Sequence, residues 1–290
     1  MATALPAAAV PRDYKAQAWR FARRNPTMAV GGAILVLMAL AAIAAPLFAG
    51  DALTMLPVNR LQPPSEKHWF GTDNLGRDVF ARTVYGAQIS LLVGLSVAAV
   101  SVLFGLAIGL TAGNSRRLDG PIMRVMDGVM AIPAILLAIA LVSLSRASVG
   151  IVIVAIVIPE VPRVVRLVRA VVLTVREQPF VEAAIAGGSR RTKILLRHIL
   201  PSTVAPLIVQ ATYICASAIL VESALSFLGA GTPPEIPTWG NMIASSRLYL
   251  ARAPWTIFFP GACLAIVVLA VNLLGDGLRD RLDPRLARRM

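Results

Sequence analysis

Charged residues, cysteines and histidines are all scarce in this sequence. Only 15% of its 290 residues are charged, whereas about a quarter of a soluble domain is charged, so the chain has too little polar surface to cover a water-soluble globule. Its two cysteines, Cys215 and Cys263, lie in apolar runs, and the sequence has neither a CxxC motif nor a Cys/His cluster. We therefore expect no disulfide framework and no metal site.

Signatures of catalysis are missing as well. The sequence has no G-x-x-x-x-G-K-[ST] phosphate loop, so we expect the chain to bind no cofactor and to supply no ATP chemistry itself. Its two histidines, His68 and His198, fall on opposite sides of the membrane in the predicted topology, which argues against a shared histidine site. We expect no catalytic residues and no enzymatic activity.

Apolar residues dominate the composition. They make up 57% of the sequence, and the mean hydropathy is +0.73, which indicates an integral membrane protein. Because each crossing needs about 20 apolar residues, we predict an all-α membrane fold with six transmembrane helices, at 28–49, 86–112, 122–144, 147–167, 203–228 and 257–277. The fourth has the weakest signal, because Pro159, Glu160 and Pro162 follow its short apolar run.

The basic residues predict how these helices are oriented. With the N-terminus in the cytoplasm, most of the 28 lysines and arginines fall on the cytoplasmic side, as the positive-inside rule requires. Both termini are then cytoplasmic, and the net charge of +13 reflects anchoring at an anionic leaflet rather than binding of nucleic acid. The predicted segments are a cytoplasmic tail (1–27), the first transmembrane helix (28–49), a periplasmic segment (50–85), a core domain of five transmembrane helices (86–277) and a cytoplasmic tail (278–290).

Small residues recur along the second predicted span. Ser101, Gly105, Gly109 and Gly113 are each four positions apart, so they share one helix face and let another helix approach closely. We read this face as helix packing within a bundle. It predicts a buried helix and says nothing about what the bundle transports.

One acidic residue lies well inside a predicted span. Glu222 is near the outer end of the fifth span, and an acid at membrane depth usually faces a cavity or a partner. Two interpretations remain open for it. It either lines the translocation path, where it would bind amines of the cargo, or is satisfied structurally by Ser223, Ser226 or a neighbouring chain.

Charged residues also lie near the inner ends of the third and fourth spans. Asp127 is three residues from Arg124, which predicts an ion pair on one helix face. Arg163, Arg166 and Arg169 recur every third residue at the cytoplasmic end of the fourth span. Because arginine can extend its charged head toward water, we read these three as anchors of orientation.

The polar stretch between the fourth and fifth spans predicts a short helix followed by a basic one. Pro179 suits the first turn of the short helix, and Gly187 or Gly188 suits its end. Glu182 near the N-terminus is favourable to the helix dipole. A helix this short is marginal in water, so its stability must come from docking, either on its own bundle or on another protein. Ser189 begins the second, basic helix.

The same stretch resembles a known motif. Glu182-Ala183-Ala184, then Gly188, then Leu200-Pro201 match in order the EAA loop of binding-protein-dependent ABC importers, although His198 stands where the general pattern often has isoleucine. The ending 198–201 is similar to the peptide-importer branch of that family. Further segments that resemble the C-type permease subunit of this branch are 70–78, 226–229, 237–242, 274–280 and 282–285.

This resemblance implies a permease subunit that forms half of the translocation pathway of an ABC importer in the cell inner membrane. The implied partners are a second homologous permease subunit, two cytoplasmic ATP-binding subunits, a periplasmic or extracellular substrate-binding protein and the lipid bilayer. The implied cargo is di- or oligopeptides, with nickel complexes or glutathione as alternatives. The residues implied in coupling to the ATPase are Glu182, Ala183, Ala184, Gly188, Leu200 and Pro201.

The residues alone also allow a secondary transporter or channel that uses no ATP. Such a protein would be expected to carry paired ion-coupling acids within its spans. Glu222 is the acid that we place well inside a span, so this alternative ranks below the ATP-driven importer.

Overall fold

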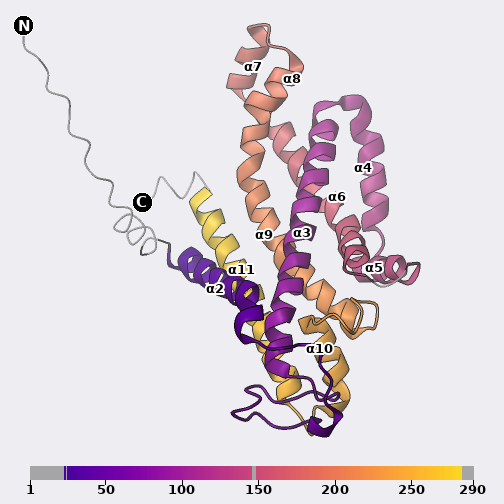
Figure 1. The fold of residues 1–290 in the computed structure, drawn as a ribbon. Coiled ribbons are helices and arrows are strands. Elements are labelled where there is room, and N and C mark those ends of the chain that lie inside the picture. The colour runs from indigo at the N-terminus through magenta and orange to yellow at the C-terminus, as the bar shows by residue number, and fades with distance from the viewer. Residues whose placement is uncertain (1–22, 24, 146–147, 283–290) are drawn as a thin grey trace, which may run out of the picture.

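The computed structural model describes residues 23, 25–145 and 148–282, and its regular elements are helical (Figure 1). Within these ranges no β-strand forms, and Thr72 and Asp78 make an isolated bridge. The longer helices are α2 (Pro26–Phe48), α3 (Val79–Asn114), α4 (Arg116–Met130), α5 (Ala134–Ser143), α6 (Val149–Val175), α9 (Leu200–Phe227) and α11 (Trp255–Leu282). The shorter ones are η1 (Pro57–Asn59), α7 (Pro179–Ala186), α8 (Arg191–Ile194), η2 (Leu195–Ile199), α10 (Trp239–Ser246) and η3 (Arg247–Tyr249).

Most of the predicted spans coincide with long apolar helices. In the described ranges four stretches are long and apolar enough to cross a membrane, namely α2, α3, α11 and the continuous run from α8 to α9, and the bent pair α4–α5 makes up to five. The fourth predicted span lies in α6, which has 27 residues but carries Glu160, Arg163 and Arg166 in its sequence. The predicted tails 1–27 and 278–290 lie largely outside the described residues.

The third predicted span, 122–144, is bent. α4 ends at Met130, α5 begins at Ala134, and the two helices differ in direction by 82°. Pro133 accounts for the break, because it has no N–H to donate and disfavours helical geometry at Ile132. The structure therefore differs here from the continuous helix that the apolar run predicts, and α4 takes a direction of its own beside α3 and α6.

α3 and α6 run in the same direction and pack through the small residues of α3. A Cβ atom added to Gly105 would lie 2.4 Å from the Cβ atom of Val164. The same close contact recurs four residues further along both helices and again after four more, in the pairs Gly109–Val168 and Gly113–Val172. The predicted close approach at this face is confirmed, and its partner is α6.

The remaining long helices complete one bundle. α9 contacts α3, α6, α10 and α11, and α2 lies along α11 (Figure 1). Here too small residues allow close contact, because a Cβ atom on Gly31 of α2 would lie 2.5 Å from the carbonyl oxygen of Ala270 in α11. The main apolar core is formed by buried residues of α3, α6, α9 and α11.

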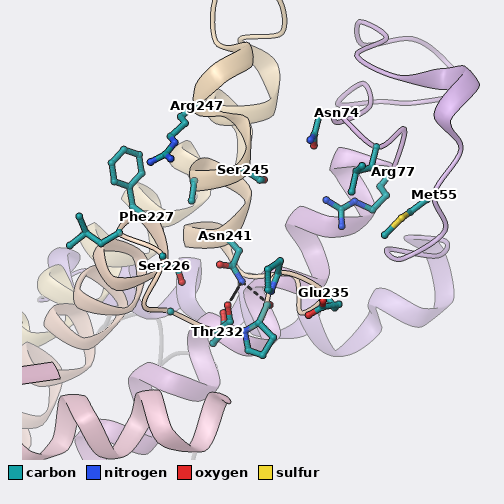
Figure 2. A pocket seen from close by; sticks show the side chains of 17 residues that line it. Met55, Asn74, Arg77, Ser226, Phe227, Thr232, Glu235, Asn241, Ser245 and Arg247 are labelled. Atoms are coloured by element: carbon teal, nitrogen blue, oxygen red, sulfur yellow. Dashed lines mark hydrogen bonds between the residues drawn. The ribbon is translucent and has the colours of Figure 1, made fainter. Parts of the chain in front are cut away.

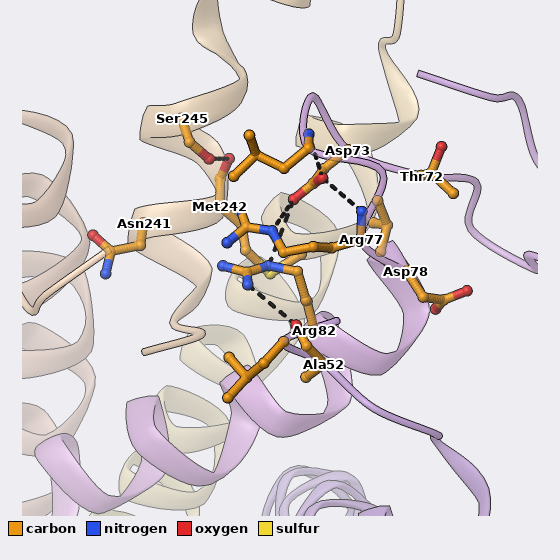
Figure 3. Close-up of polar contacts among 12 residues, drawn as sticks. Ala52, Thr72, Asp73, Arg77, Asp78, Arg82, Asn241, Met242 and Ser245 are labelled. Atoms are coloured by element: carbon orange, nitrogen blue, oxygen red, sulfur yellow. Dashed lines mark hydrogen bonds and ion pairs between the residues drawn. The ribbon is translucent and has the colours of Figure 1, made fainter. Parts of the chain in front are cut away.

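The segment 49–78 folds over one end of this bundle around a buried cluster of ions (Figure 3). Asp73 accepts hydrogen bonds from the backbone N–H groups of Leu75 and Arg77, and from Arg77 Nε at 2.7 Å. Arg82 Nε lies 3.9 Å from the same carboxylate, and Arg82 Nη1 donates to the carbonyl of Ala52. Because Arg77 and Arg82 are only 5% and 2% exposed, this cluster fixes the segment onto α3.

α10 is attached to the same end of the bundle. Trp239 is fully buried, and its Nε1–H donates to the carbonyl of Thr83 in α3 at 3.0 Å. Gly240 packs against Ser223 and Ser226 of α9, where a Cβ atom would lie 2.6 Å from the Cα of Ser223. The end that carries α10 and the segment 49–78 lies opposite the end that carries α7 and α8 (Figure 1).

Candidate functional site

α7 is the predicted short helix, and its sequence explains where it begins. Gln178 before it is extended, and Pro179 occupies the first turn, where its missing N–H costs nothing. Glu182 lies in the same turn and places a negative charge near the positive end of the helix dipole.

The other end of α7 is closed by a glycine in a left-handed conformation. The N–H of Gly188 donates to the carbonyl of Ile185 at 2.9 Å, and the N–H of Ser189 donates to the carbonyl of Ala184 at 3.1 Å. This pair of bonds is a Schellman motif, and Gly188 supplies the positive φ, +74°, that the motif requires. The prediction that the helix ends at this glycine pair is confirmed.

α7 has one anchored face and one free face. Val181 is buried in the main core, and Ala184 packs against that core. Phe180 and Ile185 lie four positions from Ala184 and Val181, at the edges of this face, and are 49% and 58% exposed. Glu182 and Ala183 lie on the other side of the helix and are exposed. The helix is thus docked on its own bundle through one face, while apolar side chains at the edges of that face and an acidic one on the other side stay exposed.

A continuous helical stretch joins α8 to α9. Its middle, Leu195–Ile199, is a π-helix, in which the N–H of Leu200 donates to the carbonyl of Leu195. This wider turn directly precedes Pro201, which has no N–H and would crowd the carbonyl four residues before it in a regular α-helix. Leu200 is half-buried and Pro201 exposed at the start of α9. Because the helical stretch is continuous, both lie in the same run of helix as Arg191, Lys193 and Arg197.

A large cavity opens beside α7, between the α3–α4 turn and α8. It has a volume of about 1070 Å³, and four arginines line it: Arg116, Arg117, Arg176 and Arg191. Val181 and Ile185 of α7 form part of its wall. The sequence marked these arginines only as topology signals, because their gathering depends on how α4, α6 and α8 meet.

Glu222 lies far from this end of the molecule. It is 22 positions after Leu200 in α9, a rise of about 33 Å. Its side chain is 0% exposed, and Ser226 Oγ donates to its Oε1 at 2.9 Å. The structural interpretation through Ser226 is therefore observed. Glu222 does not line the cavity beside α7, and its place in the translocation path stays a prediction.

A second cavity lies at the end that carries α10 (Figure 2), and Ser226, the hydrogen-bond partner of Glu222, lines it. It has a volume of about 510 Å³ and lies between the C-terminal end of α9, α10 and the segment 74–77. Arg77 and Arg247 lie at its upper side in this view and Glu235 at its lower side. Asn74, whose buried Oδ1 has no hydrogen-bond partner in the described chain, also lines it.

Charged residues of α4 and α6 pair across the two helices. Arg166 Nη2 lies 2.6 Å from Asp127 Oδ1, so the predicted pair of Asp127 with Arg124 is wrong. The prediction considered one helix only. In the structure α6 lies against α4, and its Arg166 is the cation that pairs with Asp127. Arg169 forms a bidentate ion pair with Asp119 of α4, donating from Nε and Nη2 to the two carboxylate oxygens.

A buried acid in α6 was not anticipated by the sequence. Glu160 is almost fully buried, and its Oε1 accepts from Arg163 Nη1 at 2.6 Å. The prolines around it suggested the end of a span, but α6 continues through Pro159 and Pro162 to Val175. Glu222 is therefore joined by a second acid inside the bundle.

Long apolar helices, with a short exposed helix carried between two of them, define a polytopic membrane transport subunit. Residues 101–288 match the model of the binding-protein-dependent transport system inner membrane component, and residues 14–64 match the N-terminal TM domain of oligopeptide transport permease C. The chain belongs to the family of binding-protein-dependent transport system inner membrane components. Membership implies ATP-binding and substrate-binding partners.

Curated relatives match nearly the whole chain. A probable peptide ABC transporter permease of Sinorhizobium fredii is 61% identical over 96% of each chain. A dipeptide transport system permease of Alkalihalophilus pseudofirmus is 44% identical, over 93% of this chain and 90% of the relative. An oligopeptide transport system permease of Bacillus subtilis is 37% identical, over 92% and 88%.

A solved structure has the same fold. A chain of the MetNI methionine ABC transporter, described in inward-facing conformations, superposes with a TM-score of 0.54 and 20% identity. The match covers 70% of this chain and 96% of that chain. At this identity the similarity supports the permease fold alone.

Proposed function

We propose that this chain is one of two homologous permease subunits in an ATP-driven importer of di- or oligopeptides, and that α7 transmits the movement of a cytoplasmic ATPase to the pore. The observation that carries the proposal is the construction of α7. It is a short helix that begins at Pro179 and is closed by Gly188. It is anchored through Val181, while the side chains of Phe180, Glu182 and Ile185 are exposed. Such a helix is preformed for docking.

The connections of α7 make it suited to transmit motion. The chain passes from α6 through the short segment 176–178 into α7, and from α8 without interruption into α9. When two ATP-binding subunits close on ATP, a docked α7 must move with them, and packed helices rearrange as bodies. We infer that α6 and α9 then switch the pore between inward-facing and outward-facing states.

Each residue of the coupling motif has a role in this proposal. Glu182 and Ala183 lie on the exposed face, where a small and an acidic side chain meet the ATPase. Ala184 lets α7 lie close to its own bundle, and Gly188 closes the helix. Leu200 and Pro201 then begin α9 beyond the π-turn.

We further propose six crossings with both termini in the cytoplasm. The bent pair α4–α5 would be the third crossing, and α6 the fourth. The charges of α6 support this, because Glu160, Arg163, Arg166 and Arg169 each have an ion-pair partner in α4 or α6, and paired charges are tolerated in membrane proteins. α7 lies at the end opposite α10 (Figure 1), and the basic residues of 190–197 beside it support a cytoplasmic position for that end by the positive-inside rule.

Peptide cargo is supported by the relatives and by the outer cavity. The relatives named above are described as peptide, dipeptide and oligopeptide permeases. The cavity of about 510 Å³ carries Arg247 and Glu235, so it offers charges of both signs to the carboxylate and the amine of a short peptide. Its volume falls in the usual range for small-ligand sites, about 300–1,000 Å³.

The test is uptake by the complete transporter reconstituted in vesicles, with a radiolabelled dipeptide and the binding protein outside and ATP inside. We expect uptake to require the ATP-binding subunits and to be competed by unlabelled peptides, but not by nickel or glutathione. If the chain alone accumulated peptide against a gradient without an ATPase, the importer proposal would be wrong.

Two matched pairs of variants test the role of α7. Glu182→Ala should weaken ATPase binding and uptake without changing thermal stability, because Glu182 is exposed; Glu177→Ala, an exposed acid just before α7, is its control. Gly188→Ala places a Cβ at φ +74° and should lower uptake roughly fivefold, from a strain of about 1 kcal/mol. Gly187→Ala, at φ −74°, should have little effect.

Equal uptake by all four variants, with normal membrane insertion, would contradict the coupling role of α7. A loss of insertion in the Gly188→Ala variant would instead show that the glycine acts on folding. The comparison of Glu182→Ala with Glu177→Ala would then test the coupling role of α7.

A further inference from the structure

The cavity beside α7 is surrounded by positive charge. Arg116 and Arg117 begin α4, Arg176 follows α6, and Arg191 begins α8, so three separate helices each bring a guanidinium group to one space of about 1070 Å³. No carboxylate lines this cavity in the described chain. Like charges gathered in a concave site repel one another and attract anions.

An acid of α4 near the cavity is already engaged. Asp119, one turn into α4, makes a two-pronged contact with Arg169. Among the cavity arginines, Arg176 donates to the carbonyl of Gly113 at 3.4 Å, and within the described residues Arg117 and Arg191 form no ion pair. The chain by itself therefore leaves the cavity with uncompensated positive charge.

The position of Arg176 argues against a lipid headgroup as the sole occupant of the cavity. The fourth predicted span ends at 167, next to Arg166, whereas Arg176 is ten residues further along the helix. That is a rise of about 15 Å, while the headgroup layer adds only about 5–8 Å on each side of the hydrocarbon. By this measure Arg176 lies beyond the headgroup layer, whereas Arg116 and Arg117 follow the second predicted span by only four and five residues, so one headgroup layer does not reach all four arginines.

The cavity is continuous with the free face of α7. Val181 and Ile185 line it, and the side chain of Ile185 is also exposed. A protein that covers this face would reach the rim of the cavity without moving α7. Guanidinium groups bind carboxylates with two parallel hydrogen bonds, so acidic side chains are well matched to this lining.

We propose that this cavity receives acidic side chains of the ATP-binding subunit that docks on α7. This inference rests on the proposed function and adds a second, charged contact to the apolar one made by α7. The contact involves α4, α6 and α8. The ATPase would therefore also respond to the position of the α3–α4 turn relative to α7.

The experiment uses the complete transporter purified in nanodiscs and compares neighbouring arginines. Arg191 lines the cavity, while Arg190 is exposed and lies outside it. We expect Arg191→Glu to weaken binding of the ATP-binding subunits at least tenfold, the order of change when a desolvated charge pair is disrupted, and Arg190→Glu to weaken it by less than about threefold. Raising the salt concentration should reduce this difference.

A chemical readout identifies the occupant directly. Arg191→Lys keeps the charge and supplies an amine that a carbodiimide can join to a carboxylate in contact with it. We expect mass spectrometry to find an amide bond from Lys at 191 to an Asp or Glu of the ATP-binding subunit, and none from the control Arg190→Lys.

The outcomes separate the two proposals. If wild-type protein binds no ATP-binding subunit, the proposed function itself fails. If wild-type protein binds it but the Arg191 and Arg190 variants behave alike and no cross-link forms, the cavity proposal is overturned and the coupling role of α7 stands. A requirement for phosphatidylglycerol in the nanodisc, together with equal binding of ATPase by both variants, would assign the cavity to lipid and also overturn the proposal.

Discussion

Two groups of arginines occupy the half of the molecule that carries α7, and they differ in what faces them. Arg163, Arg166 and Arg169 of α6 each lie against a carboxylate of α4 or α6. The arginines of the cavity, Arg116, Arg117, Arg176 and Arg191, line a space without acids. The first group holds the bundle together, and the second leaves its favourable interactions to be made with another chain.

Location explains this difference. The paired arginines lie along helices that pack together, so carboxylates of α4 or α6 come within reach of each of them. The cavity arginines lie at helix ends, where water can hydrate them until a partner arrives. A positive charge that is paired within the chain thus serves stability, and one that is hydrated at the surface is available for binding.

The largest effect should follow from separating α3 and α6, since α6 carries the paired arginines. Gly105→Ala would place a Cβ atom 2.4 Å from that of Val164, and we expect a loss of about 2 kcal/mol or more from overpacking. Thermal unfolding of the purified chain in detergent measures this. Gly128→Ala in α4, with nothing within 4 Å, should leave stability unchanged or slightly raised; equal unfolding midpoints would refute the tight α3–α6 contact.

An intermediate effect should follow from breaking one ion pair. Asp119→Asn removes the charge opposite Arg169, and both side chains are only partly buried, so we expect a loss of about 1 kcal/mol. Asp280→Asn, an exposed acid at the end of α11, should change stability by less than about 0.5 kcal/mol. A variant that exchanges the two charges, Asp119→Arg with Arg169→Asp, should recover part of the loss. No recovery would mean that the pair contributes through packing rather than charge.

The smallest effect should have the opposite sign. Arg117→Gln relieves repulsion in the cavity, so the isolated chain should gain a few tenths of a kcal/mol. The same substitution should weaken ATPase binding in the complete transporter. Arg169→Gln, in the paired group, should instead destabilise the isolated chain. If both substitutions destabilised the isolated chain equally, the distinction between the two groups would not hold.

Local sequence signals predicted the parts of the structure that depend on neighbours along the chain. The proline and glycines around α7 marked its ends, and the spacing of Gly105, Gly109 and Gly113 marked a helix face for close packing. These features are encoded within a few turns of one helix, so pattern and propensity suffice to find them.

Features that join distant segments were missed or misjudged. Asp127 pairs with Arg166 across two helices, although Arg124 is nearer in sequence. Asp73 and Arg77 are buried with Arg82 in one cluster, which the loop sequence gives no sign of. The cavity of four arginines is likewise assembled from three helix ends. Which side chains meet in these places depends on helix directions, and the bend at Pro133 is one that hydropathy does not reveal.

The helical run from Arg191 to Phe227 has a mechanical consequence. It comprises 37 residues, about 55 Å of helix, with α7 beside one end and the outer cavity beside the other. A rod of this length amplifies small rotations, since a tilt of about 5° about one end displaces the other by about 5 Å. If an ATPase docks on α7 as proposed, a slight turn of that subunit would be enough to widen or narrow the cavity lined by Arg247 and Glu235 by more than the diameter of a water molecule.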